Sequence, residues 1–373
     1  MRAGHDVSVI TTFPNHPLGR IPPEYRGRWW ATEWLDGIRV LRCWLYAVAN
    51  RGVGRRGLDH LSFMLTSVVF GLPRLGAVDV VIASSPTLFS AVSAWLMARL
   101  RRVPFVLEVR DLWPEAIVGL GLMRPGPAVR GLELLALFLY RQAARIVVVT
   151  EGFRDHLVHQ GVAPEKVEVI PNGADTRLFA PATDGAATRA DGPFTVAYIG
   201  SHGLSHGLGA VLDAAAAQPD VTYLLVGDGA DRDRLVAERD RRHLSNVVMR
   251  PSVGKADVPG LYAAADVCLV PLRDVRVFDA FVPSKLFEML AAGRPIIGAV
   301  RGEARHILQR SGGALLVDPE RGDQLAAAVE RLRADPDLRA ALARSGRAFA
   351  EQHYDRDALA ERYLDVLRDV TRR

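Results

Sequence analysis

The sequence predicts an α/β protein made of two doubly wound parallel sheets, and three observations lead to this fold class. Short apolar runs rich in β-branched residues alternate with helical stretches along most of the 373 residues, a pattern typical of strands buried on both faces. The alternation stops once, at 180–193, in a small and polar stretch without an apolar period, which is typical of a linker. A chain of this length also favours two domains over one.

The first half begins unusually. It opens with MRAGHDVSVITTFP, in which Gly4 is placed as a glycine that ends a helix, directly before a strand at 5–12. A domain of alternating strands and helices rarely begins at the end of a helix, so either the fold starts here or a first strand and its loop are missing from this chain. Further strands are predicted at 78–84, 104–110, 144–150 and within 165–179, with helices at 86–100 and 131–143.

The alternation restarts after the linker. Helices separate the predicted strands, so we expect right-handed parallel crossovers in both halves. An amphipathic helix closes the chain at 357–370. We therefore predict an N-terminal domain (1–179), a linker (180–193), a C-terminal domain (194–350) and a final helical segment (351–373) that packs back towards the N-terminal domain. The strands of the second half are predicted at 194–200, 221–227, 246–252, 265–271, 294–300 and 313–319.

The composition excludes several classes of protein. The formal charge is +5 and the pI about 9.4, but the arginines alternate with acids along helices, as on a solvated face. There is no zinc-finger spacing or RNP-type aromatic pattern, so no nucleic acid partner is expected. Cys43 and Cys268 lie far apart and indicate neither a disulfide framework nor a zinc site, which favours a reducing cytoplasm. No signal peptide and no apolar run of about 20 residues is present.

Ligands of open α/β sheets bind at the carboxyl ends of the strands, and in the second half these ends are rich in glycine. The stretches are 200–207, Gly227-Asp-Gly229 and Arg250-Pro-Ser. Neither G-x-G-x-x-G nor a P-loop motif is present, so a dehydrogenase and a P-loop NTPase are not indicated. Asp231 and Asp233 begin a charged helix, where acids are favoured by the helix dipole, and we do not assign them a metal.

The stretch FVPSKLFEMLAAGRP (281–295) places two charges in an apolar run. Ser284 is predicted to cap a helix that Gly293 ends, and Lys285 and Glu288 fall on one side of it. One interpretation is a surface ion pair, which contributes only a few tenths of a kcal/mol. The other is a nucleotide site, in which the ammonium and free N–H groups bind a diphosphate and the carboxylate binds the vicinal hydroxyls of a ribose.

Four motifs together resemble the retaining glycosyltransferases of family 4, which have the GT-B fold: VPSKLFEMLAAGRPIIGA, YIGSHGLSHGL, LLVGDGADRDRL and VIPNGADTRLF. The stretch VLEVRDLWPEAIVGLG and the Pro-Ser-Lys form of the helix look like a subgroup that includes bacterial fucosamine transferases of O-antigen and capsule assembly. The resemblance implies two Rossmann-like domains facing across a cleft, with the first strand of the N-terminal domain missing here.

The resemblance also assigns roles to residues. The second glutamate of the family's Glu-x7-Glu motif, which holds the ribose, matches Glu288, whereas the first falls on Ala280, beside Asp279. Many members hold the diphosphate with an arginine and a lysine after the first donor-domain strand. Ser201 and His206 are in the matching loop here, so we expect Lys285 to supply that charge. The donor-binding residues expected are Gly200, Ser201, His202, Gly203, Gly227, Arg250, Ser284, Lys285 and Glu288.

Three residues are predicted to be catalytic: Lys285, Arg110 and Asp111. Arg110 and Asp111 end a strand in EVRDLWPE, and they either fix a loop as an ion pair or contact the acceptor or donor hexose, with Glu108 on the same strand face. Trp113 is either a core residue or a sugar platform. The resemblance implies no metal and no cofactor, and a UDP-sugar as donor substrate.

The predicted function is transfer of a hexose-type sugar, with retention, from a nucleoside diphosphate sugar to a glycan acceptor, in cell-surface polysaccharide assembly. The alternatives are a non-hydrolysing sugar-nucleotide epimerase of similar fold and an inactive glycosyltransferase-like binding protein. Arg51, Arg55 and Arg56 precede an amphipathic helix within 51–72 whose apolar line runs from Leu58 to Leu72. This helix either packs between domains or docks a cytoplasmic enzyme on the anionic inner face of the plasma membrane, which suits a lipid-linked acceptor.

Overall fold

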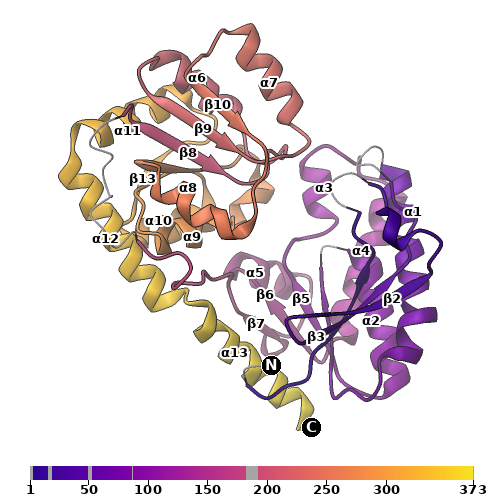
Figure 1. Ribbon diagram of the computed structural model, residues 1–373. Helices are drawn as coiled ribbons and strands as arrows, with labels where there is room; N and C mark the ends of the chain where they lie inside the picture. Colours follow the sequence, from indigo (N-terminus) through magenta and orange to yellow (C-terminus); the bar gives the residue numbers. More distant parts are fainter. Residues whose placement is uncertain (1–2, 16–18, 49–52, 86, 182–191, 373) are drawn as a thin grey trace. The chain divides into compact units, whose positions relative to one another are not determined.

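A computed structural model describes residues 3–15, 19–48, 53–85, 87–181 and 192–372 of the chain. Contacts divide it into two compact units. Unit 1 comprises Met1–Val149, Phe153–Val169 and Leu364–Arg373, and unit 2 comprises Thr150–Gly152 and Ile170–Tyr363. Each unit is an α/β structure built around parallel strands, as the sequence predicts (Figure 1).

Unit 1 holds two separate sheets within the described residues. One has the order β1-β3-β2 and the other the order β4-β5-β6-β7, in which all neighbours are parallel. Each strand predicted in this half is present, although shorter than its apolar run. The strands are β1 (Ser8–Thr12), β2 (Trp30–Leu35), β3 (Ile38–Cys43), β4 (Val81–Ser84), β5 (Phe105–Val109), β6 (Arg145–Val148) and β7 (Val167–Val169).

The antiparallel hairpin of β2 and β3 is absent from the sequence prediction. Its two-residue turn places Asp36 at φ 49° and Gly37 at φ 79°, as a type I′ turn requires. Asp-Gly between two runs of β-forming residues is the local signal that identifies such a hairpin. One face of this sheet contributes Ala31 to a small core around Phe13 and Leu45.

The predicted helix at 51–72 is three consecutive helical segments. An α-helix, α1 (Val53–Thr66), is followed by a π-helix at Ser67–Gly71 and a 3-10 turn at Leu72–Arg74. No helix among the described residues is long and apolar enough to cross a membrane. The other helices beginning in the first half are α2 (Leu88–Arg101), α3 (Glu115–Gly119), α4 (Pro127–Gln142) and α5 (Glu151–His159).

Unit 2 contains one continuous sheet of six described strands in the order β10-β9-β8-β11-β12-β13, all parallel (Figure 1). Its first strand in the chain, β8, lies in the middle, between β9 and β11. All six predicted strands are present. They are β8 (Thr195–Ile199), β9 (Thr222–Val226), β10 (Val247–Arg250), β11 (Val267–Pro271), β12 (Ile296–Ala299) and β13 (Ala314–Val317).

Helices cover this sheet, with α6 packed against α11 and α9 against α12. Side chains of β8, β9 and β11 meet those of α6 and α11 in the largest core of the unit. The helices are α6 (Gly209–Ala217), α7 (Arg232–Arg241), α8 (Val258–Ala263), α9 (Lys285–Ala291), α10 (Gly302–Ser311), α11 (Gly322–Ala334), α12 (Pro336–His353) and α13 (Arg356–Thr371).

The contacts divide the chain at residue 170, before the predicted boundary at 179. Phe179 explains the difference, because it is fully buried against Tyr262, and Arg347 donates a hydrogen bond to its carbonyl oxygen at 2.7 Å. Most of the predicted linker, 182–191, lies outside the described residues. The last residues of α13 are grouped with unit 1, where Arg145 pairs with Asp369 at 2.5 Å.

Candidate functional site

The turns after β8 and β9 pack backbone against backbone. Gly200 N–H donates to Val226 O and His202 N–H donates to Asp228 O, each at 2.9 Å. A Cβ atom at Gly227 would lie 1.9 Å from Gly200 O, so only glycine fits there. Both glycines have positive φ values, 147° and 152°, that other residues rarely adopt. The predicted glycines therefore shape one compact loop pair at the carboxyl end of the sheet.

Lys285, the first residue of α9, reaches this loop pair. Its Nζ donates a hydrogen bond to Tyr198 Oη at 2.6 Å and lies 3.9 Å from the centre of the tyrosine ring. Tyr198 Oη in turn donates to Ser201 O at 2.5 Å. A Cβ atom at Gly200 would approach Nζ to 2.5 Å. The glycine therefore makes the space that the ammonium occupies.

The ammonium of Lys285 is held without a carboxylate partner. The residue as a whole is half-buried, but its charged end is deeply enclosed, and this burial lowers the pKa of Lys285 to about 7. The charge of Glu288 opposes this effect and raises the pKa of Lys285. Among the described residues no ion pair joins Lys285 to an acid within 4 Å. The surface ion pair with Glu288, one of the two interpretations of the sequence, is therefore not formed.

Two histidines line the same loop and are neutral at pH 7. His202 is fully buried, and neither ring nitrogen has a hydrogen-bond partner within the described structure. Burial lowers the pKa of His202 to about 4 and that of His206 to about 3. Both rings lie beside Tyr198, with centroids 5.9 and 5.8 Å from its ring. At this loop the guanidinium of Arg232, which donates a hydrogen bond to Gly227 O at 3.2 Å, is charged, and Lys285 is the group whose charge can change near neutral pH.

Glu288 lies one helical turn after Lys285 and is half-buried. Burial raises its pKa, while the charges of Lys255, Arg356 and Lys285 act in the opposite direction. Its carboxylate thus faces several cations without a hydrogen bond to any of them among the described residues. Such a group can accept hydrogen bonds from hydroxyl groups of a ligand.

The remaining predicted donor residues contribute mainly backbone. Ser284 is exposed at the N-cap of α9, but its side chain makes no capping hydrogen bond, so the predicted cap is positional only. The helix ends as predicted, with Gly293 at φ 61°. Arg250 is exposed, and its carbonyl oxygen accepts a hydrogen bond from Gly227 N–H at 3.0 Å. Ser201 and Gly203 lie in the loop beside His202.

The predicted catalytic pair of unit 1 lies at the end of β5. Arg110 Nη1 is 4.0 Å from Glu108 Oε1, and the Arg110 N–H donates to Ser85 Oγ at 3.1 Å. Burial raises the pKa of Asp111 to about 6, opposed by the charge of Arg110. A buried carboxyl that titrates near neutrality at a strand end is typical of functional sites. Trp113 precedes Pro114 in a cis peptide bond.

The structure shows the surroundings of Ala280, the position where the family resemblance places the first glutamate of the Glu-x7-Glu motif. Asp279, the neighbour of Ala280 in the chain, lies 3.8 Å from Arg301. A different acid, Glu303, lies beside Ala280. Both contact the same position of Gly152, because a Cβ atom on this glycine would be 2.8 Å from Ala280 Cβ and 3.2 Å from Glu303 Oε2. Glu303 accepts hydrogen bonds from the N–H groups of residues 151 and 152, each at 2.9 Å. Burial raises its pKa. The sequence interpretation missed both Glu303 and Tyr198; Glu303 could have been found as an acid following the end of β12.

A metal site is not found. Among the described residues no group of three or more His, Cys, Asp or Glu side chains could hold an ion. Asp231, which precedes the charged helix α7, is paired in two contacts with Arg234, at 2.7 and 2.8 Å. Cys43 and Cys268 are both buried free thiols.

Two family models match the chain. Residues 1–173 match the model described as a glycosyl transferase 4-like domain, and residues 193–335 match the model described as glycosyl transferases group 1. Together they cover most of the chain. The division between them falls in the same region as the predicted linker.

Two curated relatives are named for the synthesis of cell-surface glycans. The putative colanic acid biosynthesis glycosyl transferase WcaI of Escherichia coli is 26% identical over 385 residues, covering 98% of this chain and 92% of that protein. The lipopolysaccharide core biosynthesis glycosyltransferase LpsD of Rhizobium meliloti is 28% identical over 214 residues, covering 55% of this chain and 57% of that protein.

Solved structures show the same fold at lower identity. A sucrose-phosphate synthase from Thermosynechococcus elongatus superposes with a TM-score of 0.77 at 20% identity, covering 99% of this chain and 90% of that one. HepE of Anabaena, solved in complex with UDP-glucose, gives a TM-score of 0.70 at 20% identity, covering 98% and 100% of the two chains. These neighbours and the two parallel-sheet units show the predicted fold, GT-B.

Proposed function

Because the chain belongs to the family 4 glycosyltransferases with the GT-B fold, we propose that it transfers a hexose-type sugar, with retention, from a nucleoside diphosphate sugar to a glycan acceptor in cell-surface polysaccharide assembly. The proposed donor is a UDP-sugar and the proposed acceptor is lipid-linked. We also propose that the protein resides in the cytoplasm at the inner face of the plasma membrane. We further propose that it belongs to the fucosamine transferase-like subgroup.

The observation that carries this proposal is the enclosed, unpaired ammonium of Lys285 beside a glycine loop. A buried cation without a counter-ion is unfavourable, and an arriving diphosphate would supply the missing negative charge. The absence of a side chain at Gly200 keeps the space beside the ammonium clear, since a Cβ atom there would lie 2.5 Å from Nζ. HepE, a neighbour of the same fold, was solved with UDP-glucose.

The other residues take roles consistent with this binding mode. Glu288 holds the vicinal hydroxyls of the ribose by charge-assisted hydrogen bonds, each of about 1.5–3 kcal/mol. Lys285 then stabilises the negative charge that develops on the leaving diphosphate as the glycosidic bond breaks. Gly200, Ser201, His202, Gly203, Gly227, Arg250 and Ser284 complete the donor site, and Arg110 and Asp111 contact the acceptor or the donor hexose.

Membrane contact through α1 is a separate part of the proposal. The helix exposes an apolar stripe: Leu58 and Leu65 are each 56% exposed, and Val69, in the following π-helix, is 60% exposed. Arg55 is exposed in its first turn, whereas Arg51 and the side chain of Arg56 lie outside the description. An amphipathic helix with exposed leucines and a basic end favours an anionic membrane surface, where a lipid-linked acceptor would reside.

Incubation with a panel of UDP-, GDP-, ADP- and dTDP-sugars tests the enzymatic proposal. We expect release of the nucleoside diphosphate from one UDP-sugar, stimulated by a lipid-linked glycan. Isomerised donor without any acceptor would instead identify an epimerase. Binding of the nucleotide without any turnover would identify an inactive binding protein.

Two substitutions test the site. Lys285→Met should weaken UDP binding by about 10-fold or more, because a charge-assisted contact with phosphate is lost. Lys166→Met is the control and should leave binding unchanged, because Lys166 lies in unit 1, where its Nζ donates to the carbonyl oxygens of Tyr140 and Arg141. Glu288→Gln should reduce the preference for UDP over its 2′,3′-dideoxy analogue. Unchanged UDP affinity in Lys285→Met would contradict the assignment of the diphosphate site.

A further inference from the structure

Tyr198, in the strand β8, accepts the only hydrogen bond that the Lys285 ammonium donates among the described residues. Its Oη lies 2.6 Å from Nζ, and the tyrosine side chain is fully buried. Burial raises the pKa of the Tyr198 phenol, so the hydroxyl keeps its proton at neutral pH. It donates this proton to Ser201 O at 2.5 Å. One hydroxyl group therefore joins the ammonium of α9 to the backbone of the glycine loop.

The direction of these two hydrogen bonds depends on the charge of Lys285. An ammonium has three N–H donors and no lone pair, so the Tyr198 hydroxyl can only accept from it and turns its own proton to Ser201 O. A neutral amine has a lone pair that competes for the same proton. The charged form of Lys285 therefore strengthens the hydrogen bond from Tyr198 to Ser201 O.

The peptide group between Ser201 and His202 is held at both of its polar atoms. Its oxygen accepts from Tyr198 Oη, and its N–H donates to Asp228 O at 2.9 Å. The N–H groups on either side of it, those of Ser201 and Gly203, have no hydrogen-bond partner among the described residues. Backbone N–H groups of this kind in a turn are suited to an anion. The Tyr198 hydroxyl thus fixes the peptide group that lies between two available donors.

No other titratable or charged group in the described structure takes the place of Tyr198 at the ammonium. The charge of Glu288, one turn further along α9, raises the pKa of Lys285 without an ion pair. The other groups on the surrounding elements are neutral near pH 7 or contact other atoms. The neutral groups are His202 and His206 of the loop and Tyr262 of α8, and the charged ones are Asp228 and Arg232, paired at 3.2 Å, Lys255 and Arg356 near Glu288, and Arg347 of α12 on Ala291 O.

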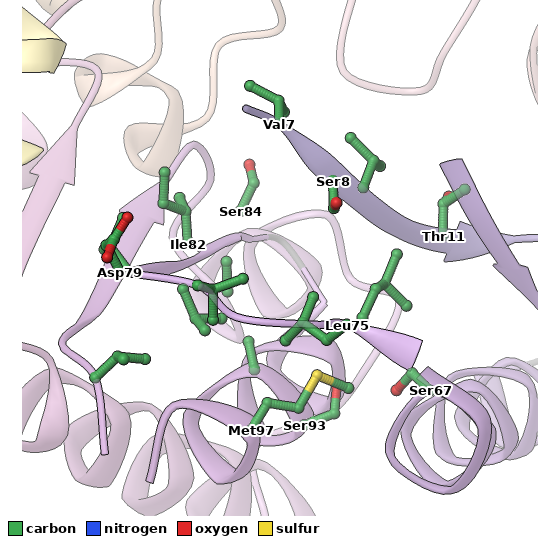
Figure 2. A pocket seen from close by; sticks show the side chains of 18 of the residues that line it. Val7, Ser8, Thr11, Ser67, Leu75, Asp79, Ile82, Ser84, Ser93 and Met97 are labelled. Atoms are coloured by element: carbon green, nitrogen blue, oxygen red, sulfur yellow. The ribbon is translucent and has the colours of Figure 1, made fainter. Parts of the chain in front are cut away.

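A cavity of unit 1 does not take part in this arrangement. Figure 2 shows it between Ser8 and Thr11 of β1 on one side and Ser93 and Met97 of α2 below. Its described lining residues all belong to unit 1, and none of them is a lysine. A ligand of the Lys285 ammonium therefore binds at the loop pair of unit 2 and not in this cavity.

We propose that Tyr198 is a positioning residue of the donor site: through its hydroxyl, the charged form of Lys285 fixes the peptide group of Ser201 and His202, so that the ammonium and the N–H groups of Ser201 and Gly203 bind one diphosphate together. This role rests on the proposed function, because it concerns the same donor site. It adds that the ammonium and the loop are coupled, and that Tyr198 acts through them without contacting the ligand.

The first experiment measures the titration of Lys285 in the protein without ligand. The chain has three lysines, Lys166, Lys255 and Lys285, so lysine labelled with ¹³C at Cε gives three NMR signals whose chemical shifts follow the charge. The signal missing from Lys285→Met identifies Lys285. Tyr198→Phe keeps the buried ring and removes the hydroxyl. It should lower the pKa of Lys285 by about one unit or more, because the charged form loses its hydrogen bond.

Tyr223→Phe is the matched control. Tyr223 is a fully buried tyrosine of the neighbouring strand β9, and its hydroxyl donates to Gln218 Oε1 at 2.6 Å. Phenylalanine at this position removes a buried hydrogen bond of the same kind, but one that does not involve the glycine loop. The variant should leave the pKa of Lys285 unchanged even if it lowers the melting temperature.

The second experiment adds UDP, with inorganic pyrophosphate as a probe of the diphosphate alone. Tyr198→Phe should weaken UDP binding by about 10-fold at pH 7, and its affinity should begin to fall about one pH unit lower than in the unaltered protein. At saturating UDP, hydrogen exchange of the Ser201 and Gly203 amides should slow in the unaltered protein and stay fast in Tyr198→Phe. In a Lys285→Met background, Tyr198→Phe should change UDP affinity by less than about 2-fold, because it acts through the lysine.

Each outcome decides the proposal. An unchanged pKa of Lys285 in Tyr198→Phe, or an equal change in Tyr223→Phe, overturns it. Weaker UDP binding in Tyr198→Phe with an unchanged pH profile also overturns it, since a purely structural role has that effect. UDP binding that is the same in Tyr198→Phe at every pH overturns the role of Tyr198 alone. Binding of neither UDP nor pyrophosphate to the unaltered protein overturns the donor site of the proposed function, and with it the diphosphate of this proposal.

Discussion

At the scale of single residues, the most informative position is Lys285. The chain has 47 lysines and arginines, of which only three are lysines. An arginine at this position would stay charged in the enclosed space beside Gly200, whereas a lysine can release its proton. Burial lowers the pKa of Lys285 to about 7, so its charge can depend on whether an anion is present. The site can therefore be empty without an unpaired buried charge.

The first prediction concerns the pH dependence of UDP binding. A bound diphosphate favours the ammonium, so binding above pH 7 requires uptake of a proton. UDP affinity should fall as the pH rises above 7, approaching about 10-fold per pH unit, and titration calorimetry in buffers of different ionisation enthalpy should detect the proton uptake. Lys285→Met should bind weakly with no such slope. An equal slope in this variant would assign the dependence to another group.

The contribution of Lys285 to the stability of the protein without UDP should rise with pH above 7, whereas the affinity for UDP falls. The pKa of Lys285 is about 7 in the folded protein and close to 10.5 when unfolded. Between these values the unfolded chain binds more protons, so the contribution of Lys285 to stability rises with pH over this window. Below pH 7 both states carry the proton and the contribution no longer changes.

At the scale of elements, the sequence identifies buried parallel strands better than the exposed hairpin. The strands of unit 2 are almost uniformly apolar, so a run such as TVAYI (195–199) is recognised from composition alone. In β2 and β3 apolar residues are mixed with Glu33, Arg39 and Arg42, and only the Asp36-Gly37 turn marks the pairing. Lys285 and the glycines were found because their residue types are unusual at their positions. Tyr198 could not be identified from the sequence in this way, because a tyrosine in an apolar strand is indistinguishable from a core residue.

The helical segment after β3 shows how local geometry changes a predicted surface. The sequence pattern places Val68 and Leu72 in line with Leu58 and Leu65, as in one continuous α-helix. The wider turns of the π-helix at Ser67–Gly71 change this register, so Val69 is strongly exposed whereas Val68 is half-buried. Periodicity alone cannot show such a change, because it assumes a constant number of residues per turn.

The second prediction tests the apolar stripe of α1. The protein should bind vesicles that contain phosphatidylserine more tightly at low than at high salt, measured by sedimentation. Leu65→Asp should weaken this binding by about 10-fold or more, since it removes an apolar contact and adds a negative charge. Leu134→Asp changes a similarly exposed leucine of α4 and should bind like the unaltered protein. Equal loss in both variants would exclude a specific role for α1.

At the scale of the whole molecule, the two units differ in how completely their sheets are paired. Unit 2 has one continuous six-stranded sheet over a large core, whereas the described residues of unit 1 form two separate sheets. Free edges and half-exposed apolar strands reduce the stabilisation that burial provides. We therefore expect unit 1 to be the less stable of the two. Multi-domain chains also commonly unfold in more than one step.

The third prediction is that calorimetry will resolve two unfolding transitions, the lower one from unit 1. The proposed UDP site lies wholly in unit 2, so a ligand that binds there stabilises that unit by mass action. At 100 times its Kd, UDP adds about 2.7 kcal/mol, which should raise the upper transition by about 5–10 °C and leave the lower one unchanged. Hydrogen exchange near the lower transition should show β4 and β5 opening before β8 and β9. A single transition that shifts as a whole with UDP would mean that the two units unfold together, and it would contradict the lower stability expected of unit 1.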